Sequence, residues 1–311
     1  MHDILIVGGG TAGLTAAVYA RRAGKTVLVL EAALWGGQIV STPEIGNYPG
    51  LPGISGAEFG ERLARQAREQ GAELRSGRVL SLEKAEGGFT AVTKLGRHAA
   101  RVLILAAGSE PRKLGLPGEE ALTGRGVSYC AACDGAFYRG KTVAVAGGGN
   151  SALEDALVLT DLAETVYLIH RREEFRGEEA TLARLREKEN LRFVLGSRVT
   201  GLVGERKLES LRITRRDGQK SVLPVSALFV AIGRSPASRA FAGLVGLDAD
   251  GGIPAGEDCR TEVPGIFAAG DIRTKKVRQL VTAAADGAAA AAEAVRFLGK
   301  SGKERSDWSS P

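Results

Sequence analysis

A strand, a glycine-rich turn, a helix and a second strand follow one another at the start of this chain, and this pattern constrains its fold most. The apolar run 4–7 precedes Gly-Gly-Gly-Thr-Ala-Gly at 8–13, a helical pattern covers 14–24, and a second apolar run covers 26–30 and ends at Glu31. This order is typical of a βαβ unit that binds a dinucleotide. A glycine-rich turn without a ligand is the alternative.

Each glycine of the motif has a separate physical use. Gly8 permits the tight turn, Gly10 lets the backbone approach a pyrophosphate, and Gly13 allows close packing of the helix. The helix N-terminus then faces the phosphates. Glu31, at the tip of the second strand, is placed to accept hydrogen bonds from a ribose.

The same unit recurs later in the chain. A shift of 139 residues aligns Gly8 with Gly147, Gly10 with Gly149 and Gly13 with Ala152, and it aligns the strand 27–30 with 166–169. Because a repeat of this kind duplicates a whole supersecondary unit, it predicts two nucleotide-binding domains in an α/β fold.

The two copies differ at the tip of the second strand. The shift aligns Glu31 with His170, and Arg171, Arg172 and Arg176 follow. A carboxylate would repel a 2′-phosphate, whereas a guanidinium pairs with it, so the second copy is expected to prefer NADPH to NADH. A solvated basic turn is the alternative.

Cys130 and Cys133 form a CxxC motif immediately before the second copy. This spacing permits a small disulfide and tends to lower the pKa of one thiol, which favours a redox pair. Half of a zinc site is the alternative, but it needs further ligands, and the other thiol, Cys259, and three scattered histidines offer no suitable spacing. No metal is therefore expected, and Cys259 is expected to be a lone thiol near a turn.

Composition narrows the class of protein. The net charge of +6 is spread along the chain without a basic stripe or a nucleic-acid-reading motif, so no nucleic-acid partner is expected. Only three cysteines in 311 residues indicate a reducing compartment. We expect no signal peptide, because Met1 is followed directly by a strand, and no apolar run is long enough for a bilayer, so we expect a cytoplasmic protein without a membrane contact.

Several further segments have readable patterns. Residues 54–70 predict an amphipathic helix, 110–118 predict a linker, and 261–271 predict a strand tipped by Gly270 and Asp271. Asp271 is suited to binding ribose or sugar-alcohol hydroxyls, or alternatively to capping the next helix. The alanine-rich run 282–297 predicts a helix, and the tail 299–311 is expected to be frayed.

Taken together, these motifs resemble the low-molecular-weight NADPH-dependent thioredoxin reductases over essentially the whole chain. The matching segments are 8–13, 36–38, 47–50, 130–134, 147–152, 170–176, 270–271 and 278–279. The resemblance implies homodimers with a discontinuous FAD domain, 1–114 and 239–311, and an inserted NADPH domain, 115–238. It also implies hinges near Leu114 and Ser238.

The resemblance further implies the site residues. Electrons would pass from NADPH to FAD, then to the Cys130–Cys133 disulfide and on to the disulfide of thioredoxin or a thioredoxin-like protein. Cys133 would face the flavin, Cys130 would attack the partner, and Asp134 would serve as acid and base. The expected FAD residues are Gly8, Gly10, Thr11, Ala12, Gly13, Glu31, Gly37, Gln38, Ile39, Thr42, Asn47, Val79, Ala107, Gly108, Gly270, Asp271, Arg278, Gln279 and Leu280. The expected NADPH residues are Gly147, Gly149, Asn150, Ser151, Ala152, His170, Arg171, Arg172, Arg176, Ile232 and Gly233.

Other functional classes are disfavoured by the same residues. Thioredoxin-reductase-like ferredoxin–NADP reductases lack a CxxC motif, which this chain has. Dithiol oxidases and ferredoxin-fed thioredoxin reductases lack a working NADPH site, which the arginines after His170 indicate here. A non-enzymatic FAD-binding protein would explain neither the cysteines nor the arginines.

Overall fold

The computed structural model describes residues 1–42 and 44–300, and it divides into two units. The first unit is assembled from residues 1–110 and 235–311, and the second, residues 111–234, is inserted between these segments. From residue 301 onward the predicted tail lies outside the described residues. The predicted α/β fold is confirmed, with a largely parallel sheet in each unit.

The first unit contains a mixed sheet in the order β3-β2-β1-β6-β5-β4. Strand β17 pairs with the C-terminal end of β6, whereas β5 pairs with its N-terminal part. Strands β3, β2, β1, β6 and β17 are parallel, and β4, β5 and β6 form an antiparallel meander. The strands are β1 (His2–Val7), β2 (Val27–Glu31), β3 (Glu73–Ser76), β4 (Val79–Ala85), β5 (Gly88–Thr93), β6 (Gly96–Leu105) and β17 (Ile266–Ala268). The helices are α1 (Thr11–Arg22), α2 (Gly56–Glu69) and α7 (Leu280–Gly299).

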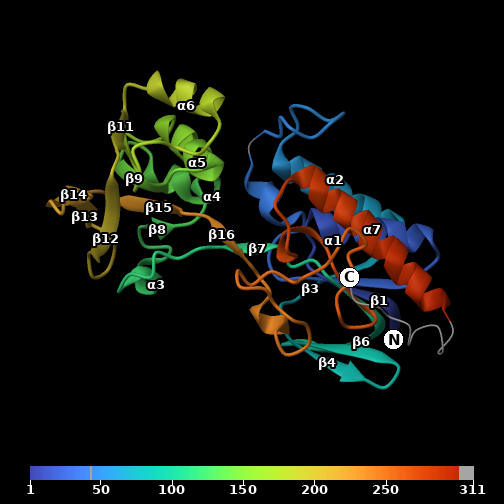
Figure 1. Ribbon diagram of the computed structural model, residues 1–311. Coiled ribbons are helices and arrows are strands. Elements are labelled where there is room, and N and C mark those ends of the chain that lie inside the picture. Colours follow the sequence, from blue (N-terminus) through green and yellow to red (C-terminus); the bar gives the residue numbers. More distant parts are fainter. Residues whose placement is uncertain (43, 301–311) are drawn as a thin grey trace. The chain divides into compact units, whose positions relative to one another are not determined.

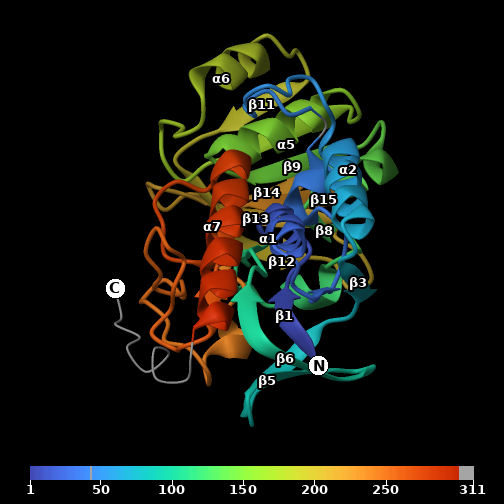
Figure 2. The same ribbon diagram turned by 90° about the vertical axis from the view of Figure 1, so that its right-hand side faces the viewer.

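Side chains on the parallel strands alternate between two apolar layers. Ile4 and Ile6 of β1 pack with α1, α2 and α7, and Figure 2 shows α1 between α7 and α2. Leu5 and Val7 point to the other face, where they pack with the meander and with residues from the C-terminal segment such as Phe241. Since successive side chains on a strand face opposite ways, β1 is apolar throughout because both of its faces are covered.

The second unit contains a wholly parallel sheet in the order β11-β10-β9-β15-β8 and a separate antiparallel sheet in the order β12-β13-β14. The parallel strands are β8 (Val127–Ser128), β9 (Thr142–Gly147), β10 (Thr165–Ile169), β11 (Leu191–Val194) and β15 (Ala227–Ala231). The antiparallel strands are β12 (Ser197–Val203), β13 (Ser210–Arg215) and β14 (Lys220–Pro224). The helices are α3 (Glu119–Leu122), α4 (Ala131–Asp134), α5 (Asn150–Thr160) and α6 (Glu179–Arg186).

The parallel sheet of the second unit is also covered on both faces. Val143 and Val145 of β9 pack with α5 and α6, whereas Ala144 and Ala146 pack with residues of β12 and β13. Figure 1 shows α5 and α6 on one side of this sheet and β12–β14 on the other. The antiparallel sheet therefore takes the place that helices occupy on the second face of a doubly wound fold.

The two copies of the repeat begin their helices in register, because α1 starts at Thr11 and α5 at Asn150. The prediction that α1 begins at residue 14 was wrong. The end of the glycine motif is already helical, since the backbone N–H of Leu14 donates to the carbonyl of Gly10 over 2.9 Å. The helix ends at Arg22, ahead of Gly24 in the left-handed conformation.

The connections between the units lie slightly before the expected hinges. Strand β7 (Ser109–Pro111) pairs with β16 (Arg234–Pro236), and the division falls within these strands. Leu114 already packs against the core of the second unit. Ser238, only 1% exposed, donates from its hydroxyl to the carbonyl of Gly251 in the first unit.

Other segments agree with their patterns. Helix α2 falls within the predicted 54–70, with Phe59 and Ala67 buried and the Ser55 hydroxyl accepting from the backbone N–H of Glu58. Helix α7 covers the predicted 282–297. No helix among the described residues combines the length and apolarity that crossing a bilayer requires.

Candidate functional site

The Cys130–Cys133 disulfide lies at the start of α4, with its Cα atoms 5.3 Å apart. Cys130 occupies the N-cap position, and its sulfur accepts a hydrogen bond from the backbone N–H of Cys133 over 3.2 Å. Cys133 is exposed in the chain and Cys130 is half-buried. A hydrogen bond from that N–H would favour a thiolate over a thiol at the Cys130 sulfur once the disulfide is reduced.

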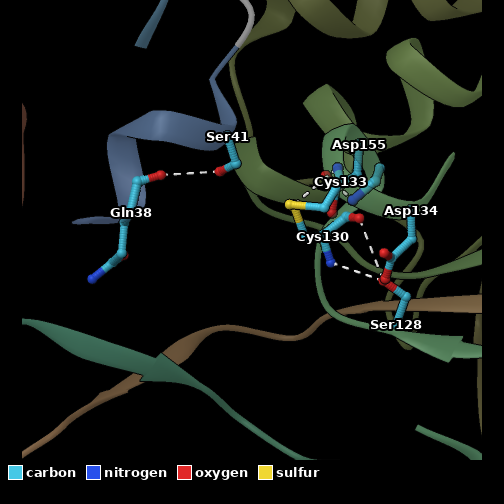
Figure 3. Close-up of a disulfide and its surroundings, with 8 residues drawn as sticks. Gln38, Ser41, Ser128, Cys130, Cys133, Asp134 and Asp155 are labelled. Atoms are coloured by element: carbon cyan, nitrogen blue, oxygen red, sulfur yellow. Dashed lines mark hydrogen bonds between the residues drawn. A yellow bond between two sulfur atoms is a disulfide. The ribbon is translucent and has the colours of Figure 1, made fainter. Parts of the chain in front are cut away.

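A hydroxyl links Asp134 to the cysteine pair, as Figure 3 shows. The carboxylate of Asp134 accepts a hydrogen bond from the Ser128 hydroxyl over 2.7 Å. The Ser128 hydroxyl oxygen in turn accepts from the backbone N–H of Cys130 over 3.1 Å. The predicted acid–base residue is therefore held beside the disulfide. Ser128, which sequence reasoning missed, has no motif of its own and is identified by these contacts alone.

Asp155 of α5 is a second carboxyl beneath the CxxC helix that sequence reasoning missed. Its Oδ1 accepts from the backbone N–H of Ala131 over 3.4 Å (Figure 3). Burial raises the pKa of Asp155 to about 7, and the charge of Glu154 adds to this, whereas the Ala131 hydrogen bond acts in the opposite direction. An acid on a mostly apolar helix was the only available signal.

The glycine-rich turn 8–13 forms the cradle of the first unit, and it has no room for a side chain at Gly8 or Gly13. A Cβ at Gly13 would lie 1.9 Å from the carbonyl oxygen of Gly8, and one at Gly8 would lie 2.3 Å from that of Ala106. Gly10 caps α1 without any side-chain hydrogen bond. The free N–H groups at this helix end and the close backbone packing fit a pyrophosphate.

Glu31 points back at the same turn from the tip of β2. Its carboxylate accepts from the backbone N–H of Gly9 over 2.5 Å and from that of Ala33 over 2.7 Å. Each oxygen retains a second lone pair, so the carboxylate can still accept from a ribose hydroxyl.

The loops expected to complete this site also converge in the first unit. The Gln38 amide donates to the backbone and side-chain oxygens of Ser109, both over 3.0 Å, and a Cβ at Gly108 would lie 3.1 Å from that amide. Asn47 donates to Gln279 over 3.2 Å although 232 residues separate them. Gln279 also forms a capping box with Thr282, so the α7 N-terminus is satisfied by the chain itself.

A buried ion cluster, which sequence reasoning missed, supports Gly270. Asp286 of α7 accepts from the backbone N–H of Gly270 over 2.9 Å, from Arg273 over 2.8 and 2.9 Å, and from Lys275 over 2.7 Å. Burial by itself would raise the pKa of Asp286, but hydrogen bonds from Arg273 and Lys275 outweigh it and lower the pKa. The position of Asp286 in an alanine-rich helix was its only sequence signal.

The second cradle, in the inserted unit, has the same construction. A Cβ at Gly147 would lie 2.3 Å from the carbonyl oxygen of Ala231, and Gly149 caps α5 without a side-chain hydrogen bond. Asn150 turns away to pair with Glu178, accepting from its backbone N–H over 2.8 Å. This turn therefore also fits a pyrophosphate.

His170 lies under the second cradle, with its ring buried. A Cβ at Gly148 would lie 2.2 Å from the His170 ring, which stacks on Phe175 at 5.3 Å between centroids. Burial and the charges of the neighbouring arginines lower the pKa of His170, although a hydrogen bond that the ring N–H donates to the backbone carbonyl of Glu174 opposes this. Its Nε2 is buried without a hydrogen-bond partner among the described residues. The His170 ring is therefore buried below the loop, whereas the arginines that follow it are exposed.

The arginines after His170 are exposed at the tip of β10. Arg171 and Arg172 line a cavity, and the backbone N–H of Arg176 donates to the carbonyl of Gly148 over 2.7 Å. The predicted cationic group is therefore next to the second cradle.

The remaining predicted residues are placed as follows. Thr11, Ala12, Val79 and Ala152 are buried, Gly37 packs on Gly10, Gly233 accepts from the Arg112 backbone N–H, and Ser151, Ile232 and Arg278 are exposed. Ile39 and Leu280 pack in one small apolar cluster, the backbone of Thr42 hydrogen-bonds to that of Ile39 and Gly56, and Asp271 lies in a short 3-10 helix. Ala107 packs against the apolar layer that contains Leu5 and Val7 of β1. Val79 is buried in that same layer.

Cys259 lies apart from the CxxC pair in the core of the first unit. It is fully buried and adopts a positive φ of 60°. Burial raises the pKa of its thiol to about 12. Throughout residues 1–42 and 44–300, no three His, Cys, Asp or Glu side chains gather as metal ligands.

Comparisons with known proteins agree with this geometry. Residues 2–287 match the family model described as "Pyridine nucleotide-disulphide oxidoreductase". The chain is 43% identical over 303 residues to a thioredoxin reductase of Mycolicibacterium smegmatis, covering 96% of this chain and 97% of that protein. It is 39% identical over 300 residues to the thioredoxin reductase of Listeria innocua, covering 96% and 94%. The structure of Lactococcus lactis thioredoxin reductase in its FR conformation matches with a TM-score of 0.92 at 37% identity, covering 96% and 99%. The chain therefore belongs to the pyridine nucleotide-disulphide oxidoreductase family, as a low-molecular-weight thioredoxin reductase.

Proposed function

We propose that this enzyme uses NADPH and FAD to reduce the Cys130–Cys133 disulfide, and that the resulting dithiol reduces the disulfide of thioredoxin or a thioredoxin-like protein. The observation that carries the proposal is the disulfide itself, placed at a helix start beside Asp134 in a unit with a nucleotide cradle. When bound, the two cofactors supply a hydride donor and a two-electron relay.

The residues that would hold each cofactor follow from the two cradles. Gly8, Gly10, Gly13 and Glu31, with the converging loops around Gln38, suit FAD in the first unit. The Gly147 cradle and the arginines at the β10 tip suit NADPH in the second. Both assignments rest on the fit of backbone and charge to phosphate groups.

The thiol chemistry balances without any further reactant. The Cys130 thiolate attacks one sulfur of the partner disulfide, forming a mixed disulfide and releasing the other partner sulfur as a thiolate. Cys133 then attacks Cys130, which restores the Cys130–Cys133 bond and releases the second partner thiolate. Asp134, linked through Ser128 to the backbone of Cys130, is placed to protonate a leaving thiolate.

A protein substrate suits the surroundings of the disulfide. Phe137, four residues after Cys133, is 73% exposed although it is a large apolar side chain. An exposed aromatic beside the reactive pair favours contact with a protein over a small thiol. Membership of the family supports a homodimer. The low cysteine content supports a reducing compartment such as the cytoplasm.

An anaerobic titration with NADPH, following flavin absorbance, tests the proposal. Full bleaching should need about two equivalents, because the flavin and the disulfide each accept two electrons. About one equivalent would show that the disulfide takes no electrons and would overturn the proposed function.

Two variants make the titration specific to the disulfide. Cys130→Ser/Cys133→Ser should need about one equivalent and should no longer support reduction of thioredoxin by NADPH. Cys259→Ala is the matched control, since that thiol is buried in the other unit, and it should still need about two.

A further inference from the structure

Five arginines, from the tip of β10 and from two strands of the antiparallel sheet, line one open cavity of about 800 Å³ in the second unit: Arg171, Arg172, Arg198, Arg215 and Arg216. The first two follow β10, at the tip where the nucleotide motif places its cations. The other three belong to β12 and to the end of β13, in the antiparallel sheet, and no motif marks them.

Backbone hydrogen bonds at Gly196 and Ser197 join the tip of β10 to the antiparallel sheet. Gly196, between β11 and β12, donates its N–H to the carbonyl of Arg172 over 3.3 Å, and its own carbonyl accepts from the backbone N–H of Arg216 over 2.7 Å. The N–H of Ser197 also donates to the carbonyl of His170 over 2.9 Å. The end of the antiparallel sheet is thus held against the strand tip, so the backbone that carries the second set of arginines lies beside the first set.

Within the part of the chain that the structure describes, the arginine charges in this cavity have no carboxylate partner. Among the described residues, none of the five guanidinium groups lies within 4.0 Å of a carboxylate, although Glu173 and Glu174 also line the cavity. Arginines elsewhere on the surface do pair, for example Arg97 with Glu83 and Arg186 with Glu179. Clustered unpaired guanidinium groups repel one another, and an anion entering the cavity would relieve that repulsion.

We propose that Arg198, Arg215 and Arg216 are specificity-determining residues that bind the 2′-phosphate of NADPH together with Arg171 and Arg172. This inference rests on the proposed use of NADPH by the second unit. The antiparallel sheet then has a role beyond covering the parallel sheet, because its arginines form the second wall of the phosphate site. The simpler alternative is a solvated basic surface, for which removing these arginines would leave nucleotide choice unchanged.

Calorimetric binding of two small nucleotides to the full-length flavoprotein tests the inference without turnover. Adenosine 2′,5′-bisphosphate carries the 2′-phosphate, and 5′-AMP lacks it. Arg215→Ala/Arg216→Ala should weaken binding of the bisphosphate by about 10-fold or more, and should change binding of 5′-AMP by less than about twofold, because only the 2′-phosphate meets these arginines. Arg198→Ala should give a smaller loss in the same direction.

The control is Arg206→Ala, which removes an exposed arginine from the turn between β12 and β13, outside the cavity. It should leave both affinities unchanged. Arg215→Lys/Arg216→Lys retains the charge and should recover part of the bisphosphate affinity, which a folding defect would not allow. Loss of affinity for both nucleotides alike in the alanine variant, without recovery in the lysine variant, would overturn the inference.

Arg171→Ala/Arg172→Ala separates this inference from the proposed function. If this variant loses bisphosphate affinity while Arg215→Ala/Arg216→Ala keeps it, the inference fails and the NADPH site stands. If the unaltered enzyme binds the two nucleotides equally well, the NADPH preference itself fails, and the inference with it.

Discussion

The two nucleotide-binding units have the same glycine-rich cradle, but their charged side chains differ in whether they are paired within the chain. In the first unit, Glu31 accepts two backbone hydrogen bonds and Asp286 is paired with Arg273 and Lys275. In the second, the five cavity arginines lack carboxylate partners among the described residues. A site whose charges are satisfied internally suits a cofactor that stays bound, whereas unpaired charge suits a ligand that binds and leaves.

Of the variants considered, Asp286→Asn should have the largest effect, because it leaves buried charges of the first unit unpaired. Removing the charge leaves Arg273 and Lys275 buried without their partner, at a cost of about 3 kcal/mol, and loosens the backbone at Gly270. The urea concentration at which half of the flavin is released measures this loss of stability. Asp258→Asn, on a surface pair with Arg260, is a control that should shift it little.

Acid should reproduce part of the Asp286 effect. The folded-state pKa of Asp286 is lowered, so its contribution is present above the unfolded value, near pH 4, and is lost as the pH falls through the folded value. Below about pH 4 the difference in stability between the unaltered enzyme and Asp286→Asn should therefore shrink. A difference that stays constant down to pH 2 would contradict this assignment.

Gly13→Ala compared with Ala152→Gly tests how alike the two cradles are. The first change places a methyl group 1.9 Å from the Gly8 carbonyl oxygen and should cost about 2–3 kcal/mol and most of the bound flavin. The reverse change in the second copy should cost only about 1 kcal/mol, from helix propensity, and should leave flavin content unchanged. Flavin absorbance per chain gives the first result, and equal losses in both variants would contradict it.

Asp155→Asn tests a buried carboxyl whose pKa is raised, in contrast to Asp286, whose pKa is lowered. The folded-state pKa of Asp155 is raised to about 7, so its favourable contribution is full below the unfolded value near pH 4 and is lost as the pH rises toward 7. The variant should therefore be more stable than the unaltered enzyme at pH 8, by about 1–2 kcal/mol, and similar at pH 4.

Melting temperatures of the reduced and oxidised protein between pH 4 and 8 measure this effect. Asp161→Asn, at the exposed end of the same helix, is the matched control and should show no such pH dependence. A stability difference that does not grow between pH 4 and 8 would contradict the raised pKa.

Sequence patterns predicted the parts of the molecule that are local in the chain. The cradles, the CxxC pair and the arginines after His170 each lie within a short motif, so spacing alone identified them. Asp286 and Arg216 could not be found this way, because their roles depend on Arg273 and on Gly196, which approach them only through tertiary packing. His170 was predicted in the right segment, but its burial depends on Gly148 having no side chain.

Cys259 offers the smallest and most selective comparison, between a core thiol and the reactive pair. With its pKa raised to about 12, its thiolate fraction at pH 8 is roughly 10³-fold below that of an ordinary thiol. In enzyme reduced by NADPH, iodoacetamide should modify Cys130 and Cys133 and spare Cys259, as peptide mass spectrometry would show. Cys259→Ala should cost only about 1 kcal/mol of stability and leave thioredoxin reduction within about twofold, since the hydrogen bond from its sulfur to the Asp286 carbonyl, at 3.5 Å, is weak. Labelling of Cys259 as fast as that of the pair would mean that the first unit opens readily, and it would contradict the tightly satisfied core on which its contrast with the second unit rests.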